Sequence, residues 1–267
     1  MRIELNRFPN GRSKALTLSY DDGPDHDRRL VEIMNSHGVR GSFHLNAGTL
    51  GQQGRVRAEE IQRLYANHEI SAHGLTHPFL DTLPREQIVH EIMEDRRRLE
   101  ALAGYPVRGM SYPYGAYNDL VLDLLPRLGI EYARTVPTTG GFDMPKDFLT
   151  WQGTCHHADH LMENARRFLE RTDTHALSLM YVWGHSFEFD AQKNWGVIEE
   201  FCALMGKRDD IWYATNIEIV DYVKALRRLR FSADSSMATN LSALPVWISV
   251  DGTVMEIPGG ATMRLGA

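Results

Sequence analysis

Residues 14–25, "KALTLSYDDGPD", combine a strand pattern with two adjacent carboxylates. The apolar and β-branched residues up to Tyr20 are typical of a buried strand, which Gly23 and Pro24 then end. Successive side chains of a strand point to opposite faces, so Asp21 and Asp22 are expected to have different tasks. Because neighbouring carboxylates repel each other, a shared cation or proton is favoured at this strand end.

Strand-like and helix-like segments alternate along most of the chain. This rhythm, without a long antiparallel signal, predicts parallel strands covered by helices. Periodicity alone leaves a barrel and an open sheet as alternatives. Near the C-terminus, apolar runs around Asp251 and Gly252 predict β-hairpins instead. We therefore divide the chain into a main (β/α) domain, residues 1–231, and a short β appendage, residues 232–267, that packs on it.

Composition and charge exclude several classes of partner. The 267 residues are 43% hydrophobic and 24% charged, as in a globular protein, and the net charge of −6 argues against nucleic acid or an anionic membrane. No apolar run reaches about 18 residues, and the N-terminus lacks an apolar signal core, so we expect neither a transmembrane helix nor a secretory signal. Cys155 and Cys202 form no CxxC pair, which suits a reducing cytoplasm. We therefore expect a cytoplasmic protein.

Further polar residues follow other predicted strands. His73 and His77 lie in "SAHGLTHP", and His185 ends the run "YVWGH". Parallel α/β folds place their active sites at such strand ends. Two histidines four residues apart, together with one aspartate, can hold a divalent metal and leave positions for water and substrate. The second aspartate is then free to take a proton from water. Zinc is the expected metal, with nickel, cobalt and iron as alternatives.

Two of these stretches match motifs of a known family. "TLSYDDGP", residues 17–24, matches T-F/L-x-x-D-D-G-P, and "HGLTH" approaches H-S/T-x-x-H, with Gly74 in place of the hydroxyl residue. On these motifs, the chain resembles the polysaccharide deacetylases, the NodB-like carbohydrate esterase family 4. The resemblance spans residues 14–225 and implies a deformed (β/α)7-8, TIM-like barrel. It also implies that Asp21 is the general base, and the implied metal ligands are Asp22, His73 and His77.

A third family motif, R-x-P-Y-G, is only partly present. The stretch "SYPYG" keeps Pro113, Tyr114 and Gly115 of this motif, but Ser111 stands where the family has arginine. The resemblance implies that the backbone N–H of Tyr114 stabilises the oxyanion, and Tyr112 is a candidate substrate contact. Arg134, at the next strand end, is our candidate substitute for the arginine that holds the base. Alternatively, Arg134 pairs with a surface carboxylate.

The remaining motifs match loosely or not at all. The stretch "VWGH" approaches L-x-x-H and implies that His185 is the general acid; Glu188 either orients it, binds sugar or stabilises a helix start. The motif D-x-x-D-W is absent, and "WQGTCHHADH" occupies its place. Trp151 is a candidate wall for a sugar ring, or else a core residue. His156 and His157 are candidates for contacting substrate, for tuning the acid, or for capping the following helix.

The leading interpretation is a metal-dependent deacetylase that acts on an acetylated carbohydrate or amino sugar. Two alternatives stay open. A two-histidine, one-carboxylate set also suits non-haem iron oxygenases. The missing motif arginine is also compatible with a sugar-binding barrel that has lost turnover. The sequence does not predict the oligomeric state.

Overall fold

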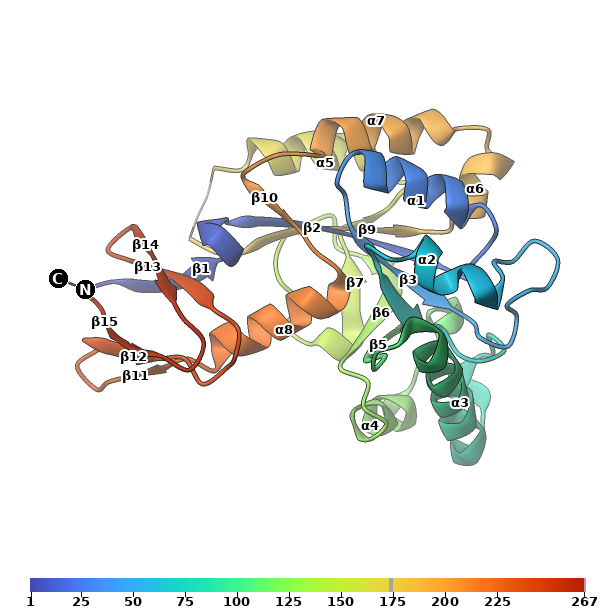
Figure 1. The fold of residues 1–267 in the computed structure, drawn as a ribbon, viewed down its shortest axis with the longest axis horizontal. Helices are drawn as coiled ribbons and strands as arrows, with labels where there is room; N and C mark the ends of the chain where they lie inside the picture. The colour runs from blue at the N-terminus through green and yellow to red at the C-terminus, as the bar shows by residue number, and fades with distance from the viewer. Residues whose placement is uncertain (173–174, 267) are drawn as a thin grey trace.

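A parallel β-sheet surrounded by helices forms the main body of the computed structural model, which describes residues 1–172 and 175–266 (Figure 1). Its strands are β2 (Lys14–Asp21), β3 (Gly41–Leu45), β4 (Glu69–Ala72), β5 (Gly109–Ser111), β6 (Tyr132–Thr138), β7 (Trp151–Gly153), β8 (Cys155–His156), β9 (Ser178–Gly184) and β10 (Ile211–Tyr213). They pair in the order β7-β6-β5-β4-β3-β2-β9-β8, and β10 also pairs with β2. All of these pairings are parallel.

The two ends of this strand order meet in one short segment. Only Thr154 separates β7 from β8. Its N–H donates to the carbonyl of Tyr181 in β9 at 2.7 Å, while β7 pairs with β6. Residues 151–156 therefore bond to β6 with their first half and to β9 with their second half, and the sheet curves round on itself. The predicted fold class, a parallel α/β sheet of the deformed-barrel type, is confirmed.

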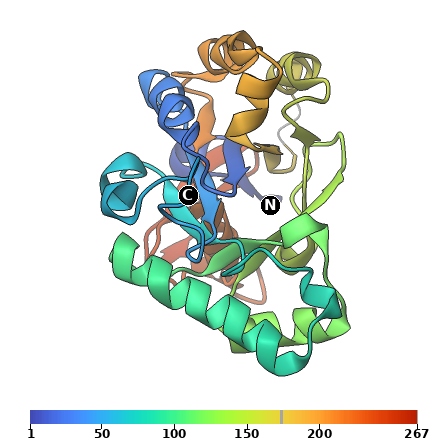
Figure 2. The same ribbon diagram turned by 90° about the vertical axis from the view of Figure 1, so that its right-hand side faces the viewer.

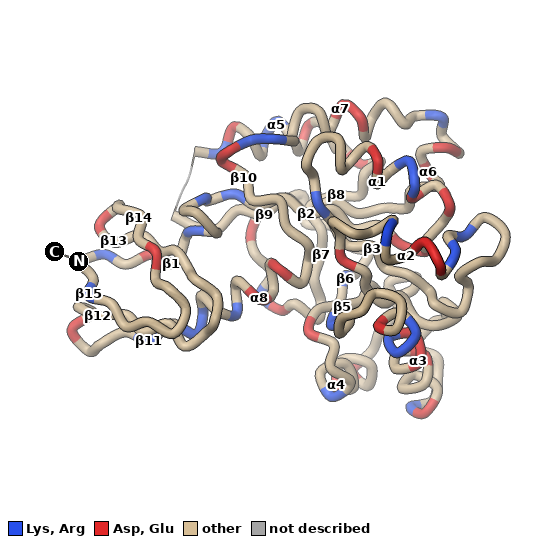
Figure 3. Tube along the Cα trace, in the orientation of Figure 1, with Lys and Arg blue, Asp and Glu red and all other residues tan. Residues whose placement is uncertain are grey.

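Helices cover the outside of this sheet. They are α1 (Asp27–Ser36), α2 (Ile61–Leu64), α3 (Arg85–Ala103), α4 (Asp119–Arg127), α5 (Leu161–Glu170), α6 (Ser186–Ala191), α7 (Trp195–Met205) and α8 (Asn216–Arg227). Helices α1, α5 and α7 lie on one side of the molecule, whereas α3 and α4 lie on the other (Figures 1 and 2). Charges of both signs are distributed along them, without a separate basic side in this view (Figure 3). Among the described helices, none is both long enough and apolar enough to cross a bilayer.

The central strand β2 positions the residues that follow it. Each of its residues is buried, because β9 pairs along one side while β10 and β3 share the other. The strand therefore sits in the middle of the apolar core, with Leu16 and Leu18 fully buried. Its last residue, Asp21, is held at the carboxyl end of the sheet by this packing.

Two small antiparallel sheets form an appendage at one end of the main body. One is ordered β1-β13-β14 and the other β11-β12-β15. Their strands are β1 (Ile3–Arg7), β11 (Arg230–Phe231), β12 (Met237–Thr239), β13 (Val246–Val250), β14 (Thr253–Ile257) and β15 (Thr262–Arg264). The appendage therefore combines strands from both ends of the chain, which lie side by side (Figure 1), whereas the sequence interpretation took it from residues 232–267. Asp251 and Gly252 join β13 to β14 with positive φ angles, as a tight hairpin turn requires.

Tyr222 of α8 ties the appendage to the main body. Its buried hydroxyl donates to the Arg7 carbonyl at 2.8 Å and accepts the Trp247 N–H at 3.0 Å. The substitution Tyr222→Phe removes this partner from both backbone groups, and we expect it to lower the free energy of unfolding by about 1–3 kcal/mol. Urea denaturation measures this change. An unchanged transition midpoint would show that the appendage does not depend on this hydroxyl.

Candidate active site

Asp21 and Asp22 reach the same cavity because the backbone bends sharply between them. Asp21 ends β2, but Asp22 and Gly23 have φ angles of 77° and 60°. A left-handed conformation is uncommon for a residue other than glycine, and it breaks the alternation of the strand. As a result, Nε2 of His73 lies 3.8 Å from Asp21 Oδ2 and 3.8 Å from Asp22 Oδ1. The expectation that the two side chains face apart therefore does not hold at this bend.

Asp22, His73 and His77 form a group that fits a divalent cation. The two Nε2 atoms are 3.1 Å apart, and Nε2 of His77 lies 3.6 Å from Asp22 Oδ1. Nδ1 of His73 lies 2.9 Å from the carbonyl oxygen of Ser111, which only accepts, so we assign the proton to Nδ1. Burial lowers the pKa of His73 to about 4, so the ring is neutral near pH 7. Its Nε2 lone pair then faces His77, as in a metal-ligand pair with a second hydrogen-bonded nitrogen.

Two acidic side chains of α3 hold the loop that carries these histidines. Asp95 accepts the backbone N–H of His73 at 3.0 Å, and burial raises the pKa of Asp95 to about 8. Glu91 accepts both the N–H and the hydroxyl of Thr76, each at 2.8 Å. Gly74 lies between them with φ of 75°, a backbone conformation that glycine adopts without strain. This conformation is a physical reason for glycine in place of the hydroxyl residue of the family motif.

Asp21 is buried and surrounded by hydrogen-bonding groups. The Arg134 guanidinium donates to its Oδ2, and the Ser111 hydroxyl donates to its Oδ1 at 3.1 Å. Nδ1 of His44 lies 3.3 Å from the same Oδ1. Burial alone raises the pKa of Asp21, but the charge of Arg134 holds it well below the usual range. The carboxylate is therefore ionised near neutral pH.

Ser111 and Arg134 are direct neighbours on β5 and β6. The register pairs these two residues with each other, so both side chains reach Asp21. The Trp183 ring covers the guanidinium at 4.2 Å from its centroid. Arg134 on β6 thus contacts Asp21. The resemblance implies that, in the family, the arginine at the position of Ser111 on β5 holds this carboxylate.

His185 faces the cavity from the end of β9, and Glu188 fixes its orientation. Glu188 Oε1 lies 3.2 Å from Nδ1 of His185, and Oε2 accepts the backbone N–H of His185 at 3.2 Å. Burial lowers the pKa of His185, but the hydrogen bond and charge of Glu188 outweigh it, and the net pKa is raised. With Nδ1 directed at Glu188, Nε2 is the ring nitrogen available to a substrate.

Two further histidines also contact the carboxylate of Glu188. The Nε2 atoms of His156 and His157 lie 3.2 and 3.0 Å from its Oε2, and these three residues form a second group close enough to hold a metal ion. However, Nδ1 of His156 accepts the Ala158 N–H at 3.2 Å, so the proton of its neutral ring is on Nε2 and points at Glu188. The group therefore fits a hydrogen-bonded carboxylate better than a cation site. Gly184 makes room for it, since a Cβ there would lie 2.1 Å from Nδ1 of His157.

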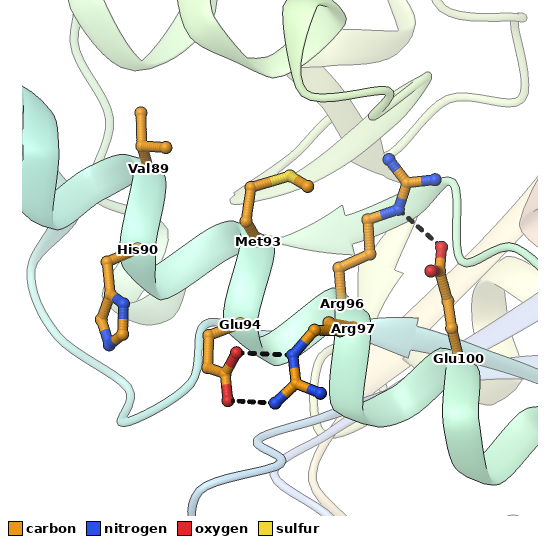
Figure 4. A pocket seen from close by; sticks show the side chains of 7 residues that line it. All are labelled: Val89, His90, Met93, Glu94, Arg96, Arg97 and Glu100. Atoms are coloured by element: carbon orange, nitrogen blue, oxygen red, sulfur yellow. Dashed lines mark hydrogen bonds and ion pairs between the residues drawn. The ribbon is translucent and has the colours of Figure 1, made fainter.

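The strand ends surround one cavity of about 290 Å³. Its lining residues are Asp21, Asp22, His73, His77, Tyr112, Tyr114, Arg134, Val136, Trp183 and His185. A different pocket, on α3, is lined by residues of that helix alone (Figure 4). There, Arg97 pairs with Glu94 at 2.7 Å and Arg96 with Glu100 at 2.8 Å. The cavity at the strand ends, in contrast, brings together groups from several strands, as an active site of this fold class does.

The part of the chain that carries both aspartates, the histidine pair and Ser111 matches a known family. Residues 9–133 fit the family model described as polysaccharide deacetylase. The chain resembles the polysaccharide deacetylases, as predicted. A chitooligosaccharide deacetylase of Sinorhizobium fredii is 28% identical over 120 residues, which are 43% of this chain and 54% of that protein. A peptidoglycan-N-acetylglucosamine deacetylase of Listeria monocytogenes is 25% identical over 125 residues, which are 45% of this chain and 26% of that protein.

The fold comparison covers more of the chain than the sequence comparison. A crystal structure from Mycobacterium smegmatis, assigned to the polysaccharide deacetylases, superposes with a TM-score of 0.63 and 20% identity. It covers 82% of this chain and 93% of that one, and so supports a shared deacetylase fold. The chain matches about half or less of the length of the two curated deacetylases above.

Most of the predicted site residues meet in the cavity at the strand ends. The aspartates, the histidine pair, Arg134 and His185 line it together, with both tyrosines of the third motif. Arg134 contacts Asp21 rather than a surface carboxylate. Tyr112 lies at the wall, but its hydroxyl donates to the Leu149 carbonyl at 2.7 Å.

Two predictions about substrate contacts need correction. The prediction that Trp151 walls the pocket is wrong, because its ring is 1% exposed and packs at 4.9 Å from Tyr181 and 5.8 Å from Tyr132. It is a core residue. His156 and His157 do not line the cavity; their rings face Glu188, which agrees with the alternative that they tune the acid.

Sequence reasoning missed two residues of the site. His44, inside the strand-like run "SFHLN", is the register partner of Asp21 on β3. Trp183 lies two positions before His185, and the period of two places both side chains on the same face of the strand. In both cases the alternation of side chains along the strand indicated which residues share a face. Deciding which face lines the site, however, requires knowing which strands are neighbours.

Proposed function

We propose that this chain is a metal-dependent hydrolase that removes acetyl groups from an amino sugar or a related acetylated carbohydrate. One observation carries the proposal: a group that fits a cation, a buried ionised carboxylate and a histidine with a raised pKa line the same cavity. The deacetylase names of the relatives support the substrate class. A cytoplasmic location is proposed on the low cysteine content alone.

The cation would be held by Asp22, His73 and His77, with zinc as the expected metal and nickel, cobalt or iron as alternatives. When bound, it would supply Lewis-acid polarisation of the acyl oxygen and make a water more acidic. The backbone N–H of Tyr114 is proposed to donate a hydrogen bond to the same oxygen.

Two residues of the chain are proposed to move protons. Asp21 accepts the proton of the attacking water, because Arg134 and Ser111 keep its carboxylate ionised and oriented. His185 donates a proton from Nε2 to the leaving nitrogen or oxygen, since Glu188 holds Nδ1 and favours the charged ring. The two groups line the same cavity, so water attack and departure of the sugar can occur on one bound substrate.

The first experiment combines metal analysis with an activity screen. The protein is stripped of metal, reloaded with zinc, nickel, cobalt or iron(II), and incubated with N-acetylated chitooligosaccharides, peptidoglycan fragments and O-acetylated sugars. Metal-dependent release of acetate is the expected result. Sugar binding without acetate release with any of the metals would instead indicate a binding module. Oxygen consumption with an oxoacid co-substrate would indicate an iron oxygenase.

Arg134 provides a test of the base. Replacing Arg134 with methionine removes the cation that holds the pKa of Asp21 down, so that pKa rises and the base is protonated at higher pH. We expect the acidic limb of the kcat/KM profile to move to higher pH. The variant also leaves a buried carboxylate without its partner, which costs about 3–5 kcal/mol of stability. Ser111→Ala, which removes a neutral partner, is the matched control and should shift the limb much less.

Glu188 provides a test of the acid. Replacing Glu188 with glutamine removes the charge that raises the pKa of His185, so that pKa falls and the ring loses its proton at lower pH. We expect the alkaline limb of the profile to move to lower pH, and turnover at pH 8 to fall by about 10–100-fold. An aryl acetate, whose leaving group needs no proton, should respond much less. Equal effects on the amide and aryl ester substrates would contradict the role of His185 as acid.

A further inference from the structure

A line of buried polar side chains leads from Asp21 into the interior of the sheet. Nδ1 of His44 lies 3.3 Å from Asp21 Oδ1, and its Nε2 lies 3.4 Å from the Tyr132 hydroxyl. The same hydroxyl lies 2.9 Å from Oε1 of Glu69, the first residue of β4. All four residues are buried. We call His44, Tyr132 and Glu69 the interior chain, because they connect the proposed base to a second acidic group.

The register of β3 and β4 places polar residues on the inner face of the sheet. Ser42 pairs with Glu69 and His44 pairs with Ser71. The residues of each strand are two positions apart, so they point to the same face. The outer positions between them do not interrupt the line of polar groups.

A glycine on β5 allows Tyr132 to join this line from β6. Gly109 is the register partner of Tyr132, and a Cβ on it would lie 2.0 Å from the tyrosine ring. The ring therefore lies over Gly109 and reaches past β5 to β4, where its hydroxyl also lies 2.9 Å from that of Ser71. Tyr132 is thus fixed between Glu69 and His44.

Glu69 is a buried acid whose hydrogen-bond partners are neutral. Its Oε2 accepts the Ser42 hydroxyl at 2.6 Å and the Ile217 N–H at 3.0 Å, and its Oε1 faces Tyr132. Burial, with a smaller contribution from the charge of Glu218, raises the pKa of Glu69 to about 7. The titratable and charged groups around Glu69 are Tyr132 of β6, His44 of β3, Tyr105 after α3, and Glu218 of α8 with its partner Arg40.

The hydroxyl of Tyr132 has one proton and therefore donates to one neighbour at a time. Burial raises the pKa of Tyr132 and lowers that of His44, so near pH 7 the tyrosine keeps its proton and the imidazole ring is neutral. An ionised Glu69 only accepts, so Tyr132 then donates to it, and Nε2 of His44 carries the ring proton. A Glu69 protonated on Oε1 donates to Tyr132, which then donates to Nε2, and the ring proton is on Nδ1. The protonation state of Glu69 thus decides whether His44 presents an N–H or a lone pair to Asp21.

We infer that Glu69 is a positioning residue for the base, because its proton sets the direction of the interior chain so that an N–H of His44 faces Asp21. This inference rests on the proposed function, in which Asp21 accepts the proton of the attacking water. An N–H beside Oδ1 attracts and orients the carboxylate, whereas a lone pair repels it. The Ser19 hydroxyl, 3.1 Å from Nδ1 of His44, donates or accepts and so fits both directions. As the pH rises through about 7, Glu69 loses its proton and the orienting N–H is lost with it.

Nuclear magnetic resonance of ¹⁵N-histidine-labelled protein tests the direction of the chain. Ring nitrogens with and without a proton have well-separated signals, and the signals of His44 are those missing from His44→Phe. Spectra are recorded with excess zinc at pH 6 and pH 8.5. In wild type, we expect the His44 proton on Nδ1 at pH 6 and on Nε2 at pH 8.5.

Two variants break the link, and a third is the matched control. In Glu69→Gln the side-chain amide donates to Tyr132 at every pH, so the His44 proton should stay on Nδ1 at both pH values. Tyr132→Phe interrupts the chain, and the protonated nitrogen should no longer change with pH; this variant carries the test if Glu69→Gln does not fold. The control Glu131→Gln removes the sequence neighbour of Tyr132, a carboxylate that pairs with Arg108 and Lys224, and should keep the wild-type change.

Kinetics then measure the effect on the reaction. The ratio of kcat at pH 8.5 to kcat at pH 6 should be up to about tenfold higher in Glu69→Gln than in wild type, the effect of one hydrogen bond. Titration of His185 is common to both proteins and cancels in this comparison. Equal ratios would show that the chain does not position the base, and would overturn the inference.

The spectra separate this inference from the proposed function. If the His44 proton stays on one nitrogen in wild type, or moves with pH in Glu69→Gln as it does in wild type, the inference is overturned and the deacetylase proposal is intact. If wild type releases no acetate with any metal, the proposed function fails. The spectra alone then decide whether Glu69 directs the chain toward Asp21.

Discussion

The substitution Asp21→Asn is expected to lower kcat by about 10²–10⁴-fold while metal binding is kept. Asp21 is the carboxylate that Arg134 and Ser111 hold, whereas Asp22 lies with the histidine pair. Asparagine has nearly the same shape but cannot accept a proton from water near neutral pH. Metal content measured beside acetate release separates the two aspartates, since Asp22→Asn should lose metal as well as activity.

A second variant guards against misfolding in this test. Asp21→Asn leaves the buried guanidinium of Arg134 without its carboxylate, and breaking a buried pair in this way costs about 3–5 kcal/mol. Replacing both residues, Asp21→Asn with Arg134→Met, removes both charges and costs less stability. It should be equally inactive. Turnover near the wild-type level in either folded variant would contradict the assignment of Asp21 as base.

The sequence predicted the elements that depend on local pattern. The buried run before Asp21 becomes the fully buried strand β2, and the hairpin expected at Asp251 and Gly252 joins β13 to β14. Polar residues at strand ends predicted which side chains converge, because the carboxyl ends of parallel strands meet at one edge of the sheet. His185 and Arg134 thereby reach the same cavity as Asp21, although they are distant in the sequence.

Features that depend on pairing between distant strands were not predictable from one sequence. The strand β1 pairs with β13, and nothing in its five residues specifies a partner more than 200 positions away. In a sequence, a tryptophan that stacks on a sugar cannot be told from a tryptophan of the core. Only the contacts of Trp151 with Tyr132 and Tyr181 show that it is a core residue. The left-handed bend at Asp22 was likewise hidden, because glycine is the residue that normally signals such a conformation.

The substitution His77→Ala is expected to weaken metal binding by more than about 100-fold. Loss of a partner that only orients a ligand costs about 10–100-fold in metal affinity, and His77 is itself a proposed ligand. Its side chain is 21% exposed, and its Nε2 faces that of His73 at 3.1 Å. Removing the ring therefore takes away a proposed cation ligand without opening a large cavity in the core.

Metal affinity and thermal stability measure this effect without relying on turnover. A metal that binds only the folded protein raises its apparent stability, so excess zinc should raise the melting temperature of wild type but not of His77→Ala at the same concentration. His90→Ala is the matched control, since His90 is an exposed histidine of α3 at the separate pocket of Figure 4. It should keep both the metal affinity and the zinc-dependent melting shift of wild type. If His77→Ala and wild type show the same affinity and the same shift, the cation is held elsewhere, and the His156, His157 and Glu188 group becomes the next set to substitute.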